Sequence, residues 1–579
     1  MNGIVNIEKK YPLSKIYLDK EIIEIEDESL LNKSLNGDLV LIEDNKIVKI
    51  IKRNEFKIVG ILNITSRVKF GVNKRGNPVF MFKSLDKKYP NFLVSSTITK
   101  KNKILKDNYV VISFHKWEDN KQYPTGKIEH IIGEVGKYEN EYEMLLYKHN
   151  INMKILKKKE IKIKNVEEKI LNENIFSIDP KGCKDIDDAL HVKKKEDGYE
   201  LGIHIADVSY YIEEDSDLDD IIKNRLTSIY IDGYKQINML PNNLSTDLIS
   251  LIPNQLRRAF SVIFDIDNKG IIKNIRYEKN VIKSKYAFSY EQVDNIFKNK
   301  NHILKEDILL AKEITEKIKG EEVDSHLLIE TLMVLTNENV AKEICKNFPK
   351  EALIRVHSGE NKDLYFNIDK INKGTYNKDL INHIRILSFN SAEYKTCKEI
   401  EEKDIKHYGL DIKYYTHFTS PIRRYADIIV HRMLYSILKK EKYKKDNSEI
   451  CKKMNEINKK IKVAERDFNK IKILKNMSES NTIELETNAY VTRISESIIT
   501  VFIPKFNVSQ NCILINKKLK DIVKISSNNN ELNITYQNKS YKIGLFDNIQ
   551  IKITNIINEI SLMKKMRITV INPNLMDLF

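Results

Sequence analysis

Hydrophobic and polar positions alternate over short stretches in the first 165 residues of the chain. Runs such as GDLVLIED (37–44), FKIVGILNI (56–64) and NYVVISFHKW (108–117) contain many β-branched residues, and turn formers separate them. A period of two over stretches of this length is typical of β-strands. Several such strands in succession predict small β-barrels in this part of the chain.

The pattern changes between about residues 170 and 475. Strands such as YELGIHIADVSYYI (199–212) are followed by helical patterns at LLIETLMVLTNENVAKEI (327–344) and IRRYADIIVHRMLYSILKK (422–440). This mixture predicts an α/β domain of about 300 residues. The charged stretch 154–170 before it is typical of a linker or an exposed helix, so we place a boundary near residue 165. After about residue 483, short strands return and predict a third barrel.

The charge of the chain favours an anionic partner. Its 579 residues include 98 Lys and Arg against 82 Asp and Glu, a net charge of +16. Nucleic acid is the first expectation and a membrane surface the second. A biased composition is the alternative explanation, because Lys, Ile and Asn are frequent throughout.

The cysteines and the hydrophobic segments favour a reducing compartment. The five cysteines are scattered, contain no CxxC pair and have no spacing that suits a tetrahedral zinc site. No stretch approaches the roughly 18 apolar residues of a membrane span, and the first residues lack the apolar core of a signal peptide. We therefore expect a soluble cytoplasmic protein with no membrane partner, with the nucleus as the alternative location.

The segment IDPKGCKDIDDAL holds Asp179, Asp185, Asp187 and Asp188 within ten residues. Four carboxylates so close together repel one another unless a positive charge lies among them. A hard divalent cation supplies that charge, and ligands that are all oxygen favour Mg²⁺ or Mn²⁺. Turn formers at 179–182 allow the segment to fold back on itself. A solvated acidic loop is the alternative.

Three further residues are weaker candidates. His204 in HIADV is suited to orienting a carboxylate or touching a substrate, but a buried structural histidine is an equal alternative. Tyr230 is suited to stacking on a base, although an isolated tyrosine is more often part of a core. Glu465 lies in a helical pattern, where an exposed salt bridge is the simpler interpretation.

The segment THFTSPIRRYADIIVHRML predicts a phosphate-binding helix start. Ser420 followed by Pro421 is typical of an N-cap and the first helical position. Arg423 and Arg424 then fall in the first turn, where free amides and the helix dipole attract phosphate. Two guanidinium groups there oppose the dipole, so we expect an anion to compensate them.

Together these segments resemble the RNase II, RNase R and Dis3 family of exoribonucleases. The resemblance rests on FSIDPKGCKDIDDALHV, LGIHIADVSYYI, RLTSIY with MLPNNLSTDLISL, LMVLTNENVA, HFTSPIRRYADIIVHR and VAERD, which stand in the family's order. The segment KWEDNKQYPTGKIEHIIGEVG is similar to the end of the family's second cold-shock barrel in Dis3-type members. AYVTRISESIITVFIPKFNVSQ is similar to the opening of its terminal S1 barrel. The similarity therefore covers nearly the whole chain.

The resemblance implies a multidomain α+β protein. A central RNB-type α/β catalytic domain (166–478) would be flanked by OB-fold barrels, which are two cold-shock-like barrels (1–75 and 76–165) and one S1-like barrel (479–579). The N-terminal nuclease domain of full-length Dis3 would be absent. The protein would act as a monomer, and association with an RNA-decay complex is expected from the family.

The resemblance also implies an activity, namely hydrolysis of single-stranded RNA from its 3′ end to nucleoside 5′-monophosphates. Asp179, Asp185, Asp187 and Asp188 match the family's active-site aspartates and would hold two Mg²⁺ about 3.5 to 4 Å apart, with Mn²⁺ as a substitute. Asp187 matches the position most critical for cleavage. Arg423 matches the arginine on the scissile phosphate, Tyr230 the aromatic at the terminal nucleotide, and Glu465 the glutamate that contacts it.

Two departures and two alternatives accompany this interpretation. Ile354 stands where bacterial members often have an aromatic residue, so the second wall of the nucleotide clamp is not assigned, and INMLP replaces the usual IPMLP. One alternative is a catalytically inactive RNB-fold protein that binds RNA as a regulator. The other is a deoxyribonuclease or general polyanion binder.

Overall fold

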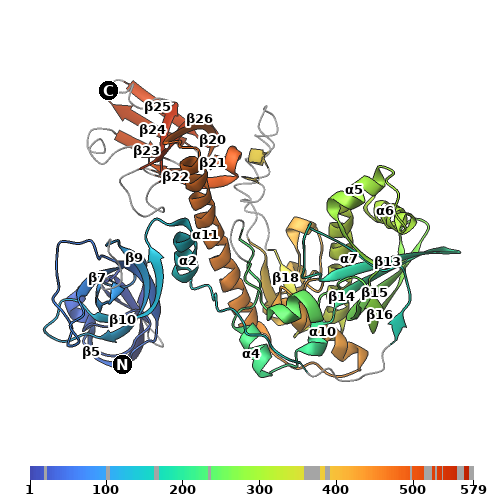
Figure 1. Cartoon of the computed structure of the whole chain (residues 1–579), viewed down its shortest axis with the longest axis horizontal. Helices are drawn as coiled ribbons and strands as arrows, with labels where there is room; N and C mark the ends of the chain where they lie inside the picture. The colour runs from blue at the N-terminus through green and yellow to red at the C-terminus, as the bar shows by residue number, and fades with distance from the viewer. Residues whose placement is uncertain are drawn as a thin grey trace. The chain divides into compact units, whose positions relative to one another are not determined.

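The computed structural model describes residues 1–8, 10–17, 22–98, 105–161, 169–231, 236–357, 379–381, 383–384, 391–495, 498–513, 524–527, 531–536, 539–556 and 566–572 (Figure 1). The chain forms two compact units. We call residues 152–459 the central unit, and residues 1–151 together with 460–579 the terminal unit. None of the helices in the described ranges is long and apolar enough to cross a membrane.

The terminal unit begins with an antiparallel five-stranded sheet. Its order is β3 (Ile22–Ile25), β2 (Ser14–Tyr17), β1 (Asn2–Ile7), β4 (Leu39–Glu43) and β5 (Lys46–Lys52), with the short helix η1 (Glu28–Leu31) beside it. Alternate residues of β1 point inward, so Val5 and Ile7 are buried. These side chains share one hydrophobic cluster with the barrel that follows.

That barrel is closed, and its strand order is β10 (Thr125–Glu134), β8 (Phe92–Ser95), β7 (Val79–Ser84), β6 (Lys57–Leu62) and β9 (Asn108–Lys116). The predicted division at residues 75 and 76 falls between β6 and β7, which are paired strands of this barrel. The division is therefore wrong. The break between sheet and barrel lies in residues 53–56. Turn formers such as Gly71, Gly76 and Pro78 belong to the connection between β6 and β7, not to a linker between domains.

The central unit contains a seven-stranded mixed sheet. Its order is β11 (Ile170–Leu171), β16 (Ile272–Lys283), β15 (Leu256–Asp267), β14 (Gly198–Ala206), β13 (Asp188–Lys195), β12 (Phe176–Asp179) and β17 (Tyr286–Ser289). The inner pairs are antiparallel, whereas β11 with β16 and β12 with β17 are parallel. Before the sheet, residues 152–161 form neither helix nor strand, and the rest of the predicted linker up to residue 168 lies outside the described residues.

Helices of the central unit pack with this sheet around one large core. They are α3 (Val208–Tyr211), α4 (Asp217–Lys223), η2 (Leu244–Leu248), α5 (Tyr290–Phe297), α6 (Lys305–Lys319), α7 (Ser325–Asn347) and α10 (Tyr425–Leu438); a two-stranded sheet pairs β18 (Leu353–Val356) with β19 (Glu393–Thr396), and η3 (Cys397–Glu399), η4 (Glu402–Asp404) and η5 (Tyr408–Leu410) follow it. The predicted helix at 327–344 is confirmed as part of α7.

One long helix, α11 (Ser448–Glu479), belongs to both units because the boundary at residues 459 and 460 lies within it. Its second half packs on α2 (Tyr138–Lys148) of the terminal unit, where the rings of Phe468 and Tyr142 stack at 4.8 Å. The predicted boundaries at 165 and 478 therefore differ from the compact units, which divide at 151 and 459.

The C-terminal part is β-rich, as predicted. One sheet has the order β22 (Val508–Ile513), β21 (Ile498–Ile503), β20 (Glu484–Ser495), β26 (Asn548–Asn555) and β27 (Met566–Asn572), and a smaller one joins β23 (Lys524–Ser527), β24 (Glu531–Tyr536) and β25 (Lys539–Gly544); η6 (Pro504–Phe506) connects β21 to β22. The Cys512 thiol on β22 donates to the Ile568 carbonyl on β27 at 3.4 Å, so the two outer strands of the larger sheet lie side by side. All five cysteines are free thiols.

Candidate active site

The four aspartates of the IDPKGCKDIDDAL segment lie on the hairpin that joins β12 and β13 in the central sheet, next to the outer strand β17. Asp179 is the last residue of β12 and Asp188 the first of β13, and the two strands are antiparallel. Gly182 has φ +84°, a left-handed conformation that glycine adopts without strain, and the Cys183 amide bonds the Pro180 carbonyl at 3.0 Å. The predicted fold-back of this segment is confirmed.

Burial dominates the electrostatics of this hairpin. Asp187 is only 4% exposed, and burial raises its pKa to about 7. Burial and the neighbouring Asp185 charge raise the pKa of Asp179 to about 6. For Asp188, burial and then the charges of Asp179 and Asp187 raise the pKa well above its ordinary value. Burial, more than the charges beside them, therefore raises the pKa values of these three carboxyls.

Arg423 is the cation that faces the hairpin. Its Nε lies 3.4 Å from Asp187 Oδ2, and its Nη2 donates to the Ser420 hydroxyl at 3.0 Å. The amide of Ile422 donates to Asp187 Oδ1 at 2.8 Å. The Arg423 side chain is 46% exposed, so the guanidinium reaches solvent as well as the aspartates. It is placed to meet an anion that approaches the hairpin.

Arg424 forms an ion pair with Asp427 rather than with the hairpin. Its Nε and Nη2 donate to the two carboxylate oxygens of Asp427 at 2.9 and 2.8 Å. Asp427 is fully buried and also accepts the Ser420 amide at 2.7 Å. The charge of Arg424 is therefore paired within the protein, and its expected contact with a substrate phosphate stays a prediction.

The helix that follows also begins later than predicted. Residues 421–423 form a turn, and α10 begins at Tyr425 with Arg424 as its N-cap. The Ser-Pro pair does not start the helix, and the Ser420 hydroxyl accepts from Arg423 Nη2 at 3.0 Å. The turn, rather than a helix end, presents Arg423.

His204 is not part of the site, contrary to the prediction. It is fully buried in β14, where His191 and Ser261 on the adjacent strands bond its two ring nitrogens at 2.8 and 2.6 Å. Burial lowers its pKa well below the ordinary value. β14 lies in the middle of the sheet and is buried on both faces, so the alternative of a structural histidine holds here.

Tyr230 lies beside the hairpin, and its predicted contact with a terminal nucleotide stays a prediction. Its hydroxyl donates to Asp185 Oδ2 at 2.7 Å, while 44% of the residue remains exposed. Gln236 donates to the same oxygen at 3.0 Å and was not predicted from the sequence. Tyr230 can thus hold a carboxylate through its hydroxyl and still offer part of its ring to a ligand.

Tyr290 is a second aromatic residue at the site that sequence reasoning missed. Strands β12 and β17 are parallel with Asp179 opposite Ser289, which places Tyr290, the next residue, near the hairpin. Burial and the charges of Asp188 and Asp179 raise the Tyr290 pKa to about 12. Its ring stacks on His326 at 3.8 Å. The capping box of Ser289 and Gln292 was readable in the sequence, but the parallel pairing of distant strands was not.

Two other predicted positions have no described contact with the hairpin. Ile354 is fully buried in β18, so it offers no wall to a nucleotide. Glu465 lies on the part of α11 that belongs to the terminal unit, and its contact with a terminal nucleotide stays a prediction.

The donor set of the hairpin fits a hard divalent cation. All of its candidate ligands are carboxylate oxygens, and the buried Oδ2 of Asp179 has no hydrogen-bond partner among the described residues. In the ranges that the structure describes, no three acidic, imidazole or thiol groups are arranged as a closed set of ligands. One oxygen of Asp185 accepts from Tyr230 and Gln236.

Three family models match the chain in succession. A Dis3-like cold-shock domain 2 matches residues 79–150, the RNB domain matches 167–324 and 311–440, and an S1 domain matches 485–568. The probable exosome complex exonuclease RRP44 of Caenorhabditis elegans is 29% identical over 553 residues, which cover 81% of this chain and 56% of that protein. The chain spans 56 to 66% of the length of such curated relatives.

Solved structures share the fold. RNase R of Mycoplasma genitalium in complex with ribose-methylated single-stranded RNA has a TM-score of 0.76 at 21% identity, covering 99% of this chain and 100% of that one. Yeast Ssd1, described as a pseudonuclease, has a TM-score of 0.69 at 18% identity, covering 98% and 96%. At these identities the likeness establishes the fold, and the fold alone does not separate an active from an inactive protein.

Proposed function

Because the chain belongs to the RNB-domain exoribonuclease family, we propose that it is an active, metal-dependent hydrolase that removes nucleotides from the 3′ end of single-stranded RNA. The products would be nucleoside 5′-monophosphates. The family and the order of its domains support the reaction class. The choice of an active enzyme is supported by the hairpin itself.

The hairpin supports this choice because it keeps all four aspartates and an accessible arginine. Asp179, Asp185, Asp187 and Asp188 would hold the metal, with Mg²⁺ the expected ion and Mn²⁺ a substitute. Bound Mg²⁺ supplies an activated water and stabilises charge on the departing 3′ oxygen. Burial raises the pKa values of Asp179 and Asp187, and a cation bound beside them would favour their ionised forms.

The residues around the hairpin have separate tasks in this proposal. Arg423 binds the scissile phosphate and offsets the charge that develops on it. The Ile422 amide fixes Asp187, so the turn that carries Arg423 and the carboxylate keep a constant spacing. Tyr230 stacks on the terminal base with the exposed part of its ring. These contacts orient the reacting phosphate next to the metal ligands.

An inactive RNA-binding protein is the alternative, because a pseudonuclease shares this fold. Such a protein has no need for several buried acidic side chains, since burying uncompensated carboxylates costs stability. The chain retains this cost at Asp187, which only Arg423 offsets among the described ion pairs. The cost is accounted for if a cation binds there.

The substrate and the setting follow the relatives. We propose RNA rather than DNA, with selection through 2′-hydroxyl contacts that no residue of this chain is assigned to make. The relative named as an exosome complex exonuclease supports association with an RNA-decay complex. Action as a monomer in the cytoplasm, with the nucleus as alternative, completes the proposal.

A degradation assay tests the proposed function. Purified protein is incubated with 5′-labelled single-stranded RNA, or DNA of the same sequence, with Mg²⁺ or with EDTA, beside the Asp187→Asn variant. We expect the RNA to shorten from its 3′ end, the DNA to persist, and both the variant and the EDTA sample to be inactive. RNA that stays intact but is retained by the wild type on a filter would support the inactive alternative.

A further inference from the structure

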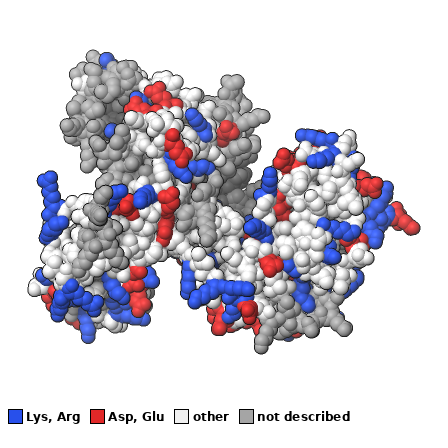
Figure 2. Space-filling model, viewed as in Figure 1, with Lys and Arg blue, Asp and Glu red and all other residues white. Residues whose placement is uncertain are grey.

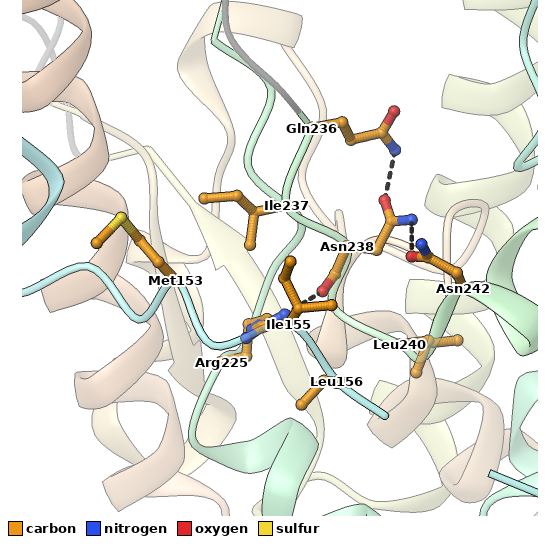
Figure 3. A pocket seen from close by; sticks show the side chains of 9 residues that line it. All are labelled: Met153, Ile155, Leu156, Arg225, Gln236, Ile237, Asn238, Leu240 and Asn242. Atoms are coloured by element: carbon orange, nitrogen blue, oxygen red, sulfur yellow. Dashed lines mark hydrogen bonds between the residues drawn. The ribbon is translucent and has the colours of Figure 1, made fainter. Parts of the chain in front are cut away.

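A row of three amide side chains leads away from Asp185. Gln236 Nε2 donates to Asp185 Oδ2 at 3.0 Å and lies 2.6 Å from Asn238 Oδ1. Asn238 Nδ2 in turn donates to Asn242 Oδ1 at 2.9 Å (Figure 3). We call Gln236, Asn238 and Asn242 the amide row. It connects a proposed metal ligand to the start of the helix η2.

The far end of the amide row is firmly anchored. Arg225 is 4% exposed and donates through its two terminal nitrogens to the carbonyls of Asn238 and Lys154. Asn238 Nδ2 also contacts the Ser245 hydroxyl at 3.3 Å, and the Thr246 hydroxyl bonds the Asn242 carbonyl at 2.8 Å. The row therefore has a fixed base at Asn238 and Asn242, and Gln236 extends from this base to Asp185.

A cavity of about 110 Å³ borders the row. The three amides line it together with Arg225, Ile237 and Leu240, and Met153, Ile155 and Leu156 come from the segment before the sheet (Figure 3). Side chains beside a cavity make few packing contacts on that side, so the amide row contributes little to the hydrophobic core. Its hydrogen bonds, rather than its packing, account for its arrangement.

We propose that the amide row is a positioning element that orients the Asp185 carboxylate for metal binding. Gln236 and Tyr230 both donate to Oδ2, whereas Oδ1 accepts, among the described residues, from the Cys183 thiol at 3.7 Å. Oδ1 is thus the oxygen left for a cation. A ligand carboxylate that is itself hydrogen-bonded is a general feature of metal sites, and such outer contacts tune affinity. The inference deepens the proposed function and rests on it.

Metal binding without RNA tests this role. The concentration of free Mn²⁺ is followed by electron paramagnetic resonance while Mn²⁺ is titrated into metal-free protein. We expect the Gln236→Leu variant, which is one atom shorter and loses the donor, to bind Mn²⁺ about tenfold more weakly than the wild type. Asn238→Ala should weaken binding in the same direction. Gln255→Leu, an exposed glutamine of the same unit, is the matched control and should change nothing.

The outcomes separate this inference from the proposed function. Unchanged Mn²⁺ affinity in Gln236→Leu overturns the positioning role. A loss of affinity that comes with a lower melting temperature also overturns it. Weaker Mn²⁺ binding with an unchanged melting temperature supports it. A wild type that binds Mn²⁺ no better than Asp187→Asn and degrades no RNA overturns the proposed function instead.

Discussion

At the residue scale, Asp187 has a carboxylate that the protein compensates only in part. The Ile422 amide and the Arg423 guanidinium contact it, yet burial still raises its pKa to about 7. In the absence of a metal the group is therefore partly protonated near neutral pH. A bound cation would favour the ionised form, so metal binding should release protons.

The raised pKa of Asp187 predicts a pH-dependent stability. A carboxyl with a folded pKa of about 7 and an unfolded value near 3.8 binds its proton more tightly in the folded state. Its contribution to stability is therefore present at low pH and is lost as the pH rises through about 7. In EDTA, the melting temperature of Asp187→Asn relative to that of the wild type should therefore rise as the pH is raised from about 5.5 to about 8.

Asp207 provides the control for this measurement. It is also buried, but the Lys279 charge 2.8 Å away helps to hold its pKa below the ordinary value. Asp207→Asn should therefore destabilise the protein by a constant amount over the same pH range. A constant difference for Asp187→Asn as well would contradict the assigned pKa.

Arg423 should act mainly on the transition state. Replacing it with lysine keeps one charge but loses the planar fork that matches a phosphate. We expect kcat to fall by about 10² to 10³, as for removal of one oxyanion donor, with RNA affinity nearly unchanged. Single-turnover degradation and filter binding in EDTA measure the two effects. A loss of RNA affinity of the same size, with an unchanged single-turnover rate, would show that Arg423 does not contact the reacting phosphate.

At the element scale, the turn at 420–424 and the start of α10 depend on one buried carboxylate. Asp427 accepts the Ser420 amide and both donors of Arg424, and the Ser420 hydroxyl accepts from Arg423. The ion pair of Arg424 with Asp427 thus supports Arg423 indirectly, through Ser420.

Arg424→Ala should destabilise the protein rather than simply weaken substrate binding. Removing one partner leaves Asp427 buried and unpaired, which costs about 3 to 5 kcal/mol. Urea unfolding should show this loss, and Arg423→Ala, in which a half-exposed side chain is removed, should lose far less. A normal unfolding midpoint with weakened RNA binding would restore the predicted substrate contact of Arg424.

How much of the site could be predicted depends on whether the signal is local. The fold-back of Asp179 towards Asp188 follows from Pro180 and Gly182 within the same segment. The place of Tyr290 depends on the parallel pairing of β12 with β17, strands about a hundred residues apart, which no local pattern encodes. The Ser-Pro signal of a helix start fails for a local reason, because the Ser420 hydroxyl accepts from Arg423 and α10 begins only at Tyr425.

At the scale of the whole molecule, the order of the parts was predictable but their limits were not. The β-rich ends and the α/β centre follow from the change in hydrophobic period. The closed barrel begins at β6, however, and not after it. The connection between β6 and β7 carries Gly and Pro residues, which are also typical of a linker between domains. The helix α11 likewise continues through the boundary between the two units.

The net charge of +16 predicts a salt-dependent affinity for RNA. Lys and Arg side chains appear on the visible faces of both units, with Asp and Glu among them (Figure 2). Binding that neutralises phosphates releases counterions, so the logarithm of the affinity should fall linearly with the logarithm of salt, by about 0.7 per contacted phosphate. Filter binding in EDTA between about 50 and 200 mM salt measures this slope. A flat line would show that the charge reflects composition alone.

The most direct test of the central claim is the chemistry of the product. Single-stranded RNA is incubated with the protein and Mg²⁺ in water enriched in ¹⁸O, and the released nucleotides are identified by mass spectrometry. We predict nucleoside 5′-monophosphates that carry one ¹⁸O in the phosphate, formed by the wild type and absent with Asp187→Asn. RNA recovered intact from the wild type, although bound with the same affinity as by the variant, would contradict the assignment of an active hydrolase.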